Sequence, residues 1–489
     1  MRSHAIPFSI TLPMLHWPAL RWMVLNLLLL SVVLRVLLLS PSVCAEGLWT
    51  PSVLYVANLS ANSVSTFQIP PNGWPYLQAT VPADQVPRAL AVHPSGRFVY
   101  VRNQGAQDIL TYDVDRRGQL TIHPVLVPPT IFSDAALSLA IHPSGASLYV
   151  PRYLDLVPPT TSRLARFAID GQGTLLYIDE FQTDAVPRVA AVAPSGAFLY
   201  LTYQGSPADE GVSMYQTAPT TGRVLAYLGT VPAGAAPEGI TVHPSGRFAY
   251  VANRGTNDVS VYTIDERSGV LREQGRVAAG AAPLAITVHP SGRFVYAVNH
   301  DDGTVSQFAV DAMTGWLTPQ GDVAAHTHPY ALAFEPTGQF AYAVNISSND
   351  LAVYTADRLT GLLTLQGFVE AGPGPVAVAV LALPADTATV QDLNGDGKAD
   401  LVWRHTSTGQ VNVWTMNGTQ VQGSGSPGTV SDLAWHIVGV QDVDGDGKAD
   451  VVWHNSTTGM VWVWLMEGTV IRDGGSPGTV SDLAWQIQP

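Results

Sequence analysis

Short stretches of alternating apolar and polar residues, separated by tight turns, recur through residues 50–384. Alternation with a period of two predicts strands that bury one face, and Pro-Ser-Gly between two such stretches predicts a hairpin. The alternation is clear at residues 90–92 before one turn and at residues 98–101 after it. Four His-Pro-Ser-Gly turns and two weaker copies recur every 46 to 51 residues, starting at His93, His142, Ala193, His243, His289 and Glu335.

A strand that contains a tyrosine follows each turn, and two more strands complete the unit, as at residues 259–262 and 276–278. Four antiparallel strands in a repeat of this length are typical of a β-propeller blade. Seven tyrosine strands occur although there are only six turns, so the first unit lacks a first strand. The seven tyrosines are Tyr55, Tyr100, Tyr149, Tyr200, Tyr250, Tyr296 and Tyr342.

A matching first strand lies at the other end of the repeat region. Residues 375–381 show a proline followed by alternating apolar residues, as do residues 283–288 before a complete turn. Pairing of this segment with residues 53–56 would join both ends of the region in one sheet and leave no open edge. The sequence therefore predicts an all-β protein, with a closed seven-bladed propeller over residues 46–384 and a small all-β tail over residues 385–489.

The tail consists of two near-copies, residues 390–439 and 440–489, and each begins with Asp-x-(Asn/Asp)-x-Asp-Gly-x-x-Asp. Oxygen side chains at alternate positions converge when the chain curls tightly, and the glycine permits that curl. Ca²⁺ takes about 6–8 oxygen ligands, which carboxylates, a backbone carbonyl and water can supply. We expect two calcium sites, in which the lysines contribute carbonyls: Asp392, Asn394, Asp396, Lys398 and Asp400, and Asp442, Asp444, Asp446, Lys448 and Asp450.

The alternative is an acidic turn without a metal, but carboxylates packed so closely repel one another unless a cation is present. Mg²⁺ suits an all-protein cage less well than Ca²⁺ does. The loops are not EF-hands, because position twelve lacks a glutamate and the flanking patterns predict strands. Two repeats are too few to close a ring. The strand at residues 462–464, Trp-Val-Trp, is either core or binding surface, and core is the commoner role.

Charge and the N-terminal segment indicate the compartment. The formal net charge of −14 argues against a nucleic-acid partner, which would need a basic face. Residues 22–39 are apolar, with arginines before them and small residues after them, which predicts a signal peptide over residues 1–45. An uncleaved membrane anchor is the alternative, and Arg35 within the run weakens it. We expect a secreted, periplasmic or cell-surface protein without disulfides, because Cys44 is the only cysteine.

Phe-Ala-Tyr-Val-Ala-Asn at residues 248–253, followed by Asp-Val-Ser-Val-Tyr at 258–262, resembles the Tyr-Val-x-Asn repeats of lactonase-type seven-bladed propellers. That family includes bacterial 6-phosphogluconolactonases, fungal carboxymuconate-lactonising enzymes and exported propellers of unassigned function. The resemblance covers residues 50–384 and implies the fold more specifically than an activity. The acidic loops of residues 390–489 resemble FG-GAP-type and VCBS-type repeats, which implies calcium binding.

Ligands of propellers usually meet the end of the central channel where the first strand of each blade begins. Several arginines and histidines are expected on that rim, and arginine binds planar anions well. Ordinary rim polarity is the alternative explanation for them. The candidate ligand-binding residues are Arg88, Arg188, Arg152, Arg254, Tyr330 and His328, and the candidates for a catalytic base are His300 and Glu238.

Sugar lactonases of this family typically show Pro-Arg-His at the start of a first strand and Asn-Glu in a later loop. Here the two Pro-Arg pairs are followed by Ala89 and Val189, and Asn299 is followed by His300. A lactone hydrolase needs a proton carrier, so the sequence favours an exported scaffold that binds an extracellular protein or a small anionic ligand. A lactone hydrolase is the alternative. The His-Pro-Ser-Gly histidines are predicted to pack blades together on the opposite face.

Overall fold

The computed structural model describes residues 52–123, 138–154, 161–183, 185–205, 209–383 and 391–480. Strands and turns make up these segments, and none of them forms a helix long and apolar enough to cross a membrane. The predicted signal peptide and its cleavage point lie outside the described residues.

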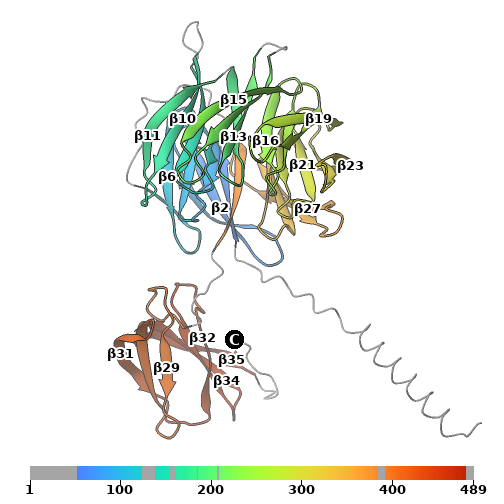
Figure 1. Ribbon diagram of the computed structural model, residues 1–489. Coiled ribbons are helices and arrows are strands. Elements are labelled where there is room, and N and C mark those ends of the chain that lie inside the picture. The colour runs from blue at the N-terminus through green and yellow to red at the C-terminus, as the bar shows by residue number, and fades with distance from the viewer. Residues whose placement is uncertain are drawn as a thin grey trace, which may run out of the picture. The chain divides into compact units, whose positions relative to one another are not determined.

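Seven four-stranded antiparallel sheets form the larger part of the described chain (Figure 1). The first three sheets are β28 (Pro375–Ala382), β1 (Ser52–Asn58), β2 (Ser63–Ile69) and β3 (Tyr76–Pro82); β4 (Pro87–Val92), β5 (Phe98–Asn103), β6 (Asp108–Val114) and β7 (Leu120–Ile122); and β8 (Ala140–Ile141), β9 (Ser147–Leu154), β10 (Thr161–Ile169) and β11 (Leu175–Gln182).

The other four sheets follow the chain in the same way. They are β12 (Val186–Val192), β13 (Phe198–Gln204), β14 (Gly211–Thr217) and β15 (Val224–Pro232); β16 (Pro237–Val242), β17 (Phe248–Asn253), β18 (Asp258–Ile264) and β19 (Leu271–Ala278); β20 (Pro283–Val288), β21 (Phe294–Asn299), β22 (Thr304–Val310) and β23 (Leu317–Ala324); and β24 (Pro329–Phe334), β25 (Phe340–Asn345), β26 (Asp350–Ala356) and β27 (Leu363–Glu370).

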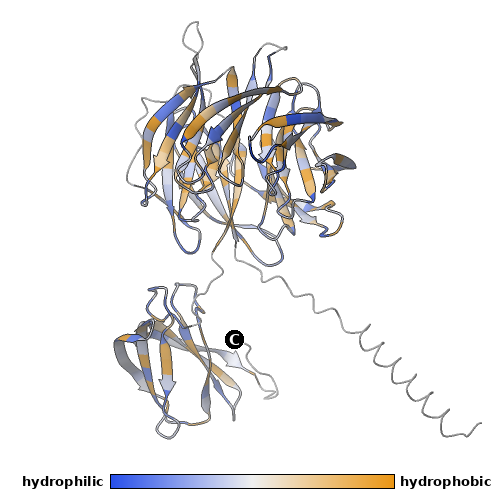
Figure 2. Cartoon of the chain, viewed as in Figure 1, coloured by the Kyte–Doolittle hydropathy of each residue, from blue (hydrophilic) through white to orange (hydrophobic). Residues whose placement is uncertain are grey.

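The first sheet joins the two ends of the propeller, as the sequence predicts. Strand β28 pairs antiparallel with β1, with Val380 opposite Leu54 and Val378 opposite Val56. The first strands of neighbouring sheets also contact each other in the cyclic order β28, β4, β8, β12, β16, β20, β24 and back to β28. The seven sheets are therefore the blades of one ring. Figure 2 shows apolar and polar residues alternating along their strands.

The seven repeated tyrosines lock each blade to the next. Each is buried, and its hydroxyl donates a hydrogen bond to a glycine carbonyl in the outer hairpin of the following blade. Tyr55 bonds to the carbonyl of Gly118 at 2.8 Å, and Tyr342 closes the circle by bonding to that of Gly73 at 2.9 Å. Burial raises the pKa of these tyrosines above its ordinary range, so they remain hydrogen-bond donors at physiological pH.

The His-Pro-Ser-Gly histidines make a second contact between blades, which confirms their predicted packing role. Nε2 of His93 lies 3.0 Å from the carbonyl oxygen of Gly145, and Nε2 of His142 lies 2.8 Å from that of Gly196. His243 and His289 contact the next turn in the same way. These glycines have a positive φ, and a Cβ on Gly145 would stand 2.6 Å from the ring of His93.

The propeller has two chemically different faces. One face, which we call the proline face, contains the connections between blades, whose prolines begin the first strands, and the loops between second and third strands. The other, the hairpin face, contains the His-Pro-Ser-Gly turns and the glycine hairpins. On the proline face, the residue before a proline often has a positive φ, as do Val86, Ala236, Ala282 and His328.

The tail contains two further sheets. One has three described strands, β29 (Leu401–Arg404), β30 (Gln410–Asn417) and β31 (Gln420–Thr429); the other has four, β32 (Trp435–Gln441), β33 (Asp450–Asn455), β34 (Met460–Glu467) and β35 (Val470–Thr479). The two sheets share one core, in which Trp453 of the second packs with Val411 and Val413 of the first. Trp462 is 38% exposed, so this aromatic position of β34 is only partly buried.

Candidate functional site

The loops of the proline face are held at one level by a repeated backbone bond. In each of five blades, the first residue after the second strand donates its N–H to the carbonyl of the residue before the blade-opening proline. Arg254 bonds to Ala236 at 3.0 Å, and His300 bonds to Ala282 at 3.1 Å. This bond brings the predicted loops to the same face as the prolines. Leu59, Gln104 and Ile346 hold the corresponding positions in the first, second and seventh blades.

Two histidines from neighbouring blades meet on this face. His300 follows β21, His328 precedes β24, and their rings stack with centroids 4.7 Å apart and planes inclined by 17°. Tyr330 on β24 approaches His300 edge-on, at 6.4 Å between ring centroids. Nδ1 of His328 lies 2.7 Å from the Ser347 hydroxyl, which fixes the ring. Residues that the sequence analysis considered one by one thus form a single group.

A carboxylate and a guanidinium complete this group, which we call the histidine cluster: Arg254, His300, Asp301, His328 and Tyr330. Oδ1 of Asp301 lies 2.6 Å from Nδ1 of His300. The hydrogen bond from His300 lowers the pKa of Asp301, and the charges of His300, Arg254 and His328 lower it further. Asp301 is therefore an anion at neutral pH, and it directs the Nδ1 proton of His300.

The other predicted rim residues are engaged elsewhere. Arg188 forms a two-pronged ion pair with Glu238, with Nε···Oε2 at 2.9 Å and Nη2···Oε1 at 2.5 Å. Glu238 is buried and also accepts a bond from Gln204, so this carboxylate is held as a structural partner. Nη1 of Arg152 lies 2.7 Å from Oε2 of Glu180.

Arg88 and His326 each have a local partner as well. Nε of Arg88 donates to Gln104 at 2.8 Å. Nδ1 of His326 lies 2.6 Å from Oδ2 of Asp350, and its ring packs against Phe368. Ser347 and Asp350 are partners of histidines that were not predicted from the sequence. The signal was available, because both lie in or beside the loop after β25, which is equivalent to the loops that contain Arg254 and His300.

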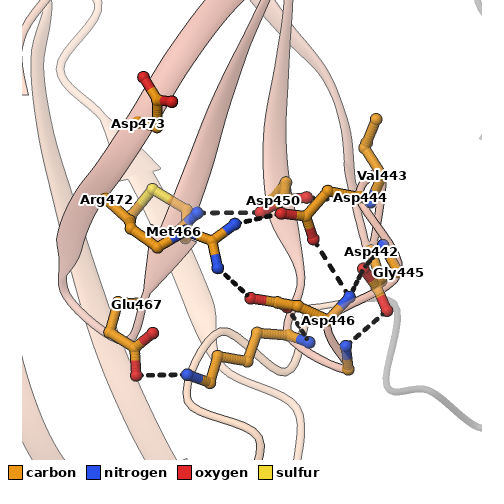
Figure 3. Close-up of polar contacts among 12 residues, drawn as sticks. Asp442, Val443, Asp444, Gly445, Asp446, Asp450, Met466, Glu467, Arg472 and Asp473 are labelled. Atoms are coloured by element: carbon orange, nitrogen blue, oxygen red, sulfur yellow. Dashed lines mark hydrogen bonds and ion pairs between the residues drawn. The ribbon is translucent and has the colours of Figure 1, made fainter.

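The acidic loops of the tail form a second candidate site, and Figure 3 shows the second of these loops. In the second loop, carboxylate oxygens of Asp442, Asp444 and Asp450 lie within 4.8 Å of one another. The Asp442 carboxylate accepts the backbone N–H groups of residues 445, 446 and 447 at 2.7–3.0 Å. Gly445 and Gly447 have φ values of +79° and +86°, which produces the tight curl that the sequence predicts.

The first loop has the same backbone arrangement. Asp392 accepts the N–H groups of residues 395, 396 and 397, and Asp400 accepts those of Leu393 and Met416. Burial raises the pKa of Asp400 and of Asp450, and neighbouring carboxylates raise both further. Hard oxygen donors gathered at such a curl fit Ca²⁺ by their chemistry, and a cation there would relieve the repulsion.

The described sheets and these two sites define a class of protein, a β-propeller with an acidic-loop tail. The propeller belongs to the lactonase family: the model of "Lactonase, 7-bladed beta-propeller" matches residues 50–124, 212–330 and 285–380. The FG-GAP-like repeat matches residues 392–453. Both resemblances inferred from the sequence are confirmed.

Individual relatives are distant. The 6-phosphogluconolactonase of Yersinia enterocolitica is 27% identical over 202 residues, which are 40% of this chain and 58% of that protein. The corresponding enzyme of Pectobacterium carotovorum is 26% identical over 37% of this chain and 54% of its own length. The chain thus spans little more than half the length of these curated relatives.

Solved structures agree on the fold. A putative 6-phosphogluconolactonase of Bacteroides fragilis aligns with a TM-score of 0.59 at 20% identity, over 68% of this chain and 98% of its own. The periplasmic gluconolactonase of Pseudomonas aeruginosa aligns with a TM-score of 0.58 at 22% identity, over 68% of this chain and all of its own. At these identities the likeness establishes the propeller fold alone.

Proposed function

We propose that the propeller hydrolyses a small polyhydroxylated or anionic lactone at the histidine cluster. The sequence alone favoured a binding scaffold, because the proton carriers typical of the family are missing from their usual positions. The stacked His300 and His328, with Asp301 on Nδ1 of His300, supply a base in another place. That geometry is the observation on which the proposal depends, and the names of the relatives support the reaction class.

In this mechanism Asp301 holds the Nδ1 proton of His300, so Nε2 is the position that takes a proton from water. The hydroxide oxygen forms a bond to the lactone carbonyl carbon, and the ring C–O bond then breaks. The leaving alkoxide takes the proton back from His300, which gives the hydroxy acid. Arg254 is exposed and cationic, so it would hold the carboxylate or phosphate of the substrate and the developing negative charge.

The test is hydrolysis of a panel of sugar lactones and acyl lactones by the purified protein, followed as acid release in a pH-stat. We expect His300→Gln to lower kcat by about 10²–10⁴-fold, the usual contribution of a general base. Arg254→Ala should mainly raise KM. Arg272→Ala is the matched control, because it removes an exposed arginine from the outer strand β19. Undiminished turnover in His300→Gln would refute the assignment.

A ligand-binding scaffold is the second candidate. The pairing of Glu238 with Arg188 favours it, because the buried carboxylate of Glu238, one of the two predicted bases, is neutralised by a guanidinium. In this case lactones or their hydroxy acids bind at the histidine cluster without turnover. Calorimetric titration with a hydroxy acid distinguishes the two functions: binding that depends on Arg254, with no hydrolysis by the wild-type protein, identifies a scaffold.

We also propose that each acidic loop of the tail holds one Ca²⁺. Asp392, Asp396 and Asp400 with Asn394 would supply the side-chain oxygens of the first site, and the four aspartates of the second loop those of the second. The bound ion would neutralise converging carboxylates and so rigidify the tail. Chelation should lower the melting temperature of the wild-type protein but not of an Asp396→Ala/Asp446→Ala double variant. An equal melting temperature of the wild type with and without chelator would refute calcium binding.

Export is proposed from the apolar segment before residue 45 and the net charge. Under this proposal the propeller meets its substrate outside the cytoplasm, and under the scaffold function it binds an extracellular protein or a small anionic ligand there. Fractionation of expressing cells with N-terminal sequencing tests the proposal. A mature chain that begins at Glu46 in the periplasm or medium is expected, and an intact N-terminus in the membrane fraction would indicate an anchor instead.

A further inference from the structure

The two acidic loops of the tail are not equivalent, although their backbones are. Position three of the loop is Asn394 in the first repeat and Asp444 in the second. The first loop therefore holds three carboxylates and the second holds four. Of the arginines within the tail, one reaches into the second loop and none into the first: Nη1 of Arg472 lies 2.8 Å from Oδ2 of Asp446, and Nη2 bonds to Asp444 (Figure 3).

The position of Arg472 is set by the strand from which it comes. In the hairpin of β34 and β35, the register shifts between Leu465 and Met466, which face Asp473 and Ile471, so Arg472 is the extra residue of a β-bulge. A bulge redirects one side chain out of the regular alternation, and here that side chain reaches the loop. The hairpin of β30 and β31 has the same bulge, and the extra residue there is Gln422.

Because the two bulges have the same backbone register, the two hairpins differ here in the side chain of the extra residue, which is Gln422 in the first repeat and Arg472 in the second. Arg472 brings one positive charge to a loop with one more carboxylate, so the four carboxylates of the second loop and Arg472 together carry −3, the same charge as the three carboxylates of the first loop. The guanidinium occupies oxygens of Asp444 and Asp446 that would otherwise face a cation. Gln422 in the first repeat has no charge with which to compete.

We propose that Arg472 acts as a built-in counter-cation that Ca²⁺ must displace, so that the second loop binds Ca²⁺ more weakly than the first. This inference rests on the calcium binding proposed above and assigns Arg472 as the residue that sets the difference. Binding at the second loop then releases the Arg472 side chain. The tail responds to calcium in two steps, a tight one at the first loop and a weaker one at the second.

The expected size follows from the geometry. An exposed ion pair contributes at most about a fivefold factor, and a guanidinium bonded to two carboxylates contributes about tenfold. We therefore expect Arg472→Gln to tighten calcium binding at the second loop about tenfold. The reciprocal change, Gln422→Arg, should weaken binding at the first loop. Gln420→Arg is the matched control, since it adds the same charge on the same strand at an exposed position outside the bulge.

Calcium titration calorimetry of the chelator-stripped full chain measures each loop separately when the other is disabled. Asp396→Ala isolates the second loop, and Arg472→Gln is then tested in that background. Asp446→Ala isolates the first loop, in which Gln422→Arg and Gln420→Arg are compared. Calcium binding with the same dissociation constant before and after Arg472→Gln would overturn the role of Arg472 and leave calcium binding intact. No calcium binding in the wild type or in any variant would overturn the calcium proposal itself.

Discussion

Removal of one tyrosine hydroxyl tests whether the ring is closed. Tyr342 on β25 donates to the carbonyl of Gly73 in the hairpin between β2 and β3, so this bond joins the last blade to the first. Tyr342→Phe keeps the packing of the aromatic side chain and removes only the hydroxyl. The Gly73 carbonyl is then left without that donor in a buried setting, which costs about 1–3 kcal/mol.

The corresponding shift in melting temperature can be estimated from size. A propeller of about 330 residues has an unfolding entropy of roughly 0.7 kcal/mol per degree, so a loss of about 1–3 kcal/mol lowers the melting temperature by about 1–4 °C. Differential scanning calorimetry resolves a change of this size. Tyr250→Phe removes the equivalent hydrogen bond to Gly315 within the ring, and it should have the same effect.

Tyr76→Phe is the control, since this tyrosine is 55% exposed on the outer strand β3 and its loss should change little. In an open ring the bond from Tyr342 would not form, whereas the bond from Tyr250 would. A Tyr342→Phe variant that melts with the wild type, beside a Tyr250→Phe variant that melts lower, would therefore refute closure through the first blade.

Three further outcomes are expected. Burial, and then a hydrogen bond with Asp84, raise the pKa of Asp108 to about 6. The stability that protonated Asp108 contributes is therefore complete below about pH 4 and is lost as the pH rises through 6. Asp84→Asn should reduce the pH dependence of the free energy of unfolding in urea between pH 4 and 7, and an unchanged pH dependence would contradict this. Trp453→Ala should lower the free energy of unfolding of the tail by about 3–5 kcal/mol, because Trp453 is 1% exposed. Trp403 is 50% exposed, so Trp403→Ala should cost about 1 kcal/mol or less. Chemical denaturation measures both losses, and equal losses would contradict the shared core. Gly315→Ala should melt well below Gly246→Ala, because both glycines have a φ near +74° but only the Cβ at position 315 would meet Phe248, at 2.3 Å; identical melting would show that this contact relaxes freely.

The architecture of the propeller was predictable because it depends on periodic signals. Alternating apolar residues identify the strands, glycine turns identify the hairpins, and the surplus tyrosine strand at Tyr55 points to closure by the segment around Val378. Those signals are local, and each is repeated several times. The partners of the tyrosines were not predictable in this way, because the carbonyls of Gly73 and Gly118 become acceptors only when neighbouring blades pack.

The candidate site was predictable only in part, because its residues meet across blades. The rim position of His300 and His328 followed from the repeat, but their stacking depends on ring orientations set by Asp301 and Ser347. The pairing of Arg188 with Glu238 was predictable from the sequence. Both residues follow a blade-opening proline by one position, so they lie at equivalent places on adjacent first strands and carry opposite charges.

Repetition also identifies where function is to be sought in this chain. Equivalent positions share one backbone conformation, so a residue that departs from its equivalents is not required by the fold. After the second strand, the first and last blades place Leu59 and Ile346, while the fifth and sixth place Arg254 and His300. Before the blade-opening prolines, apolar or small residues recur, except at His328. Both departures fall at the junction of the fifth, sixth and seventh blades, so the chemistry of the propeller is expected there and not around the whole rim.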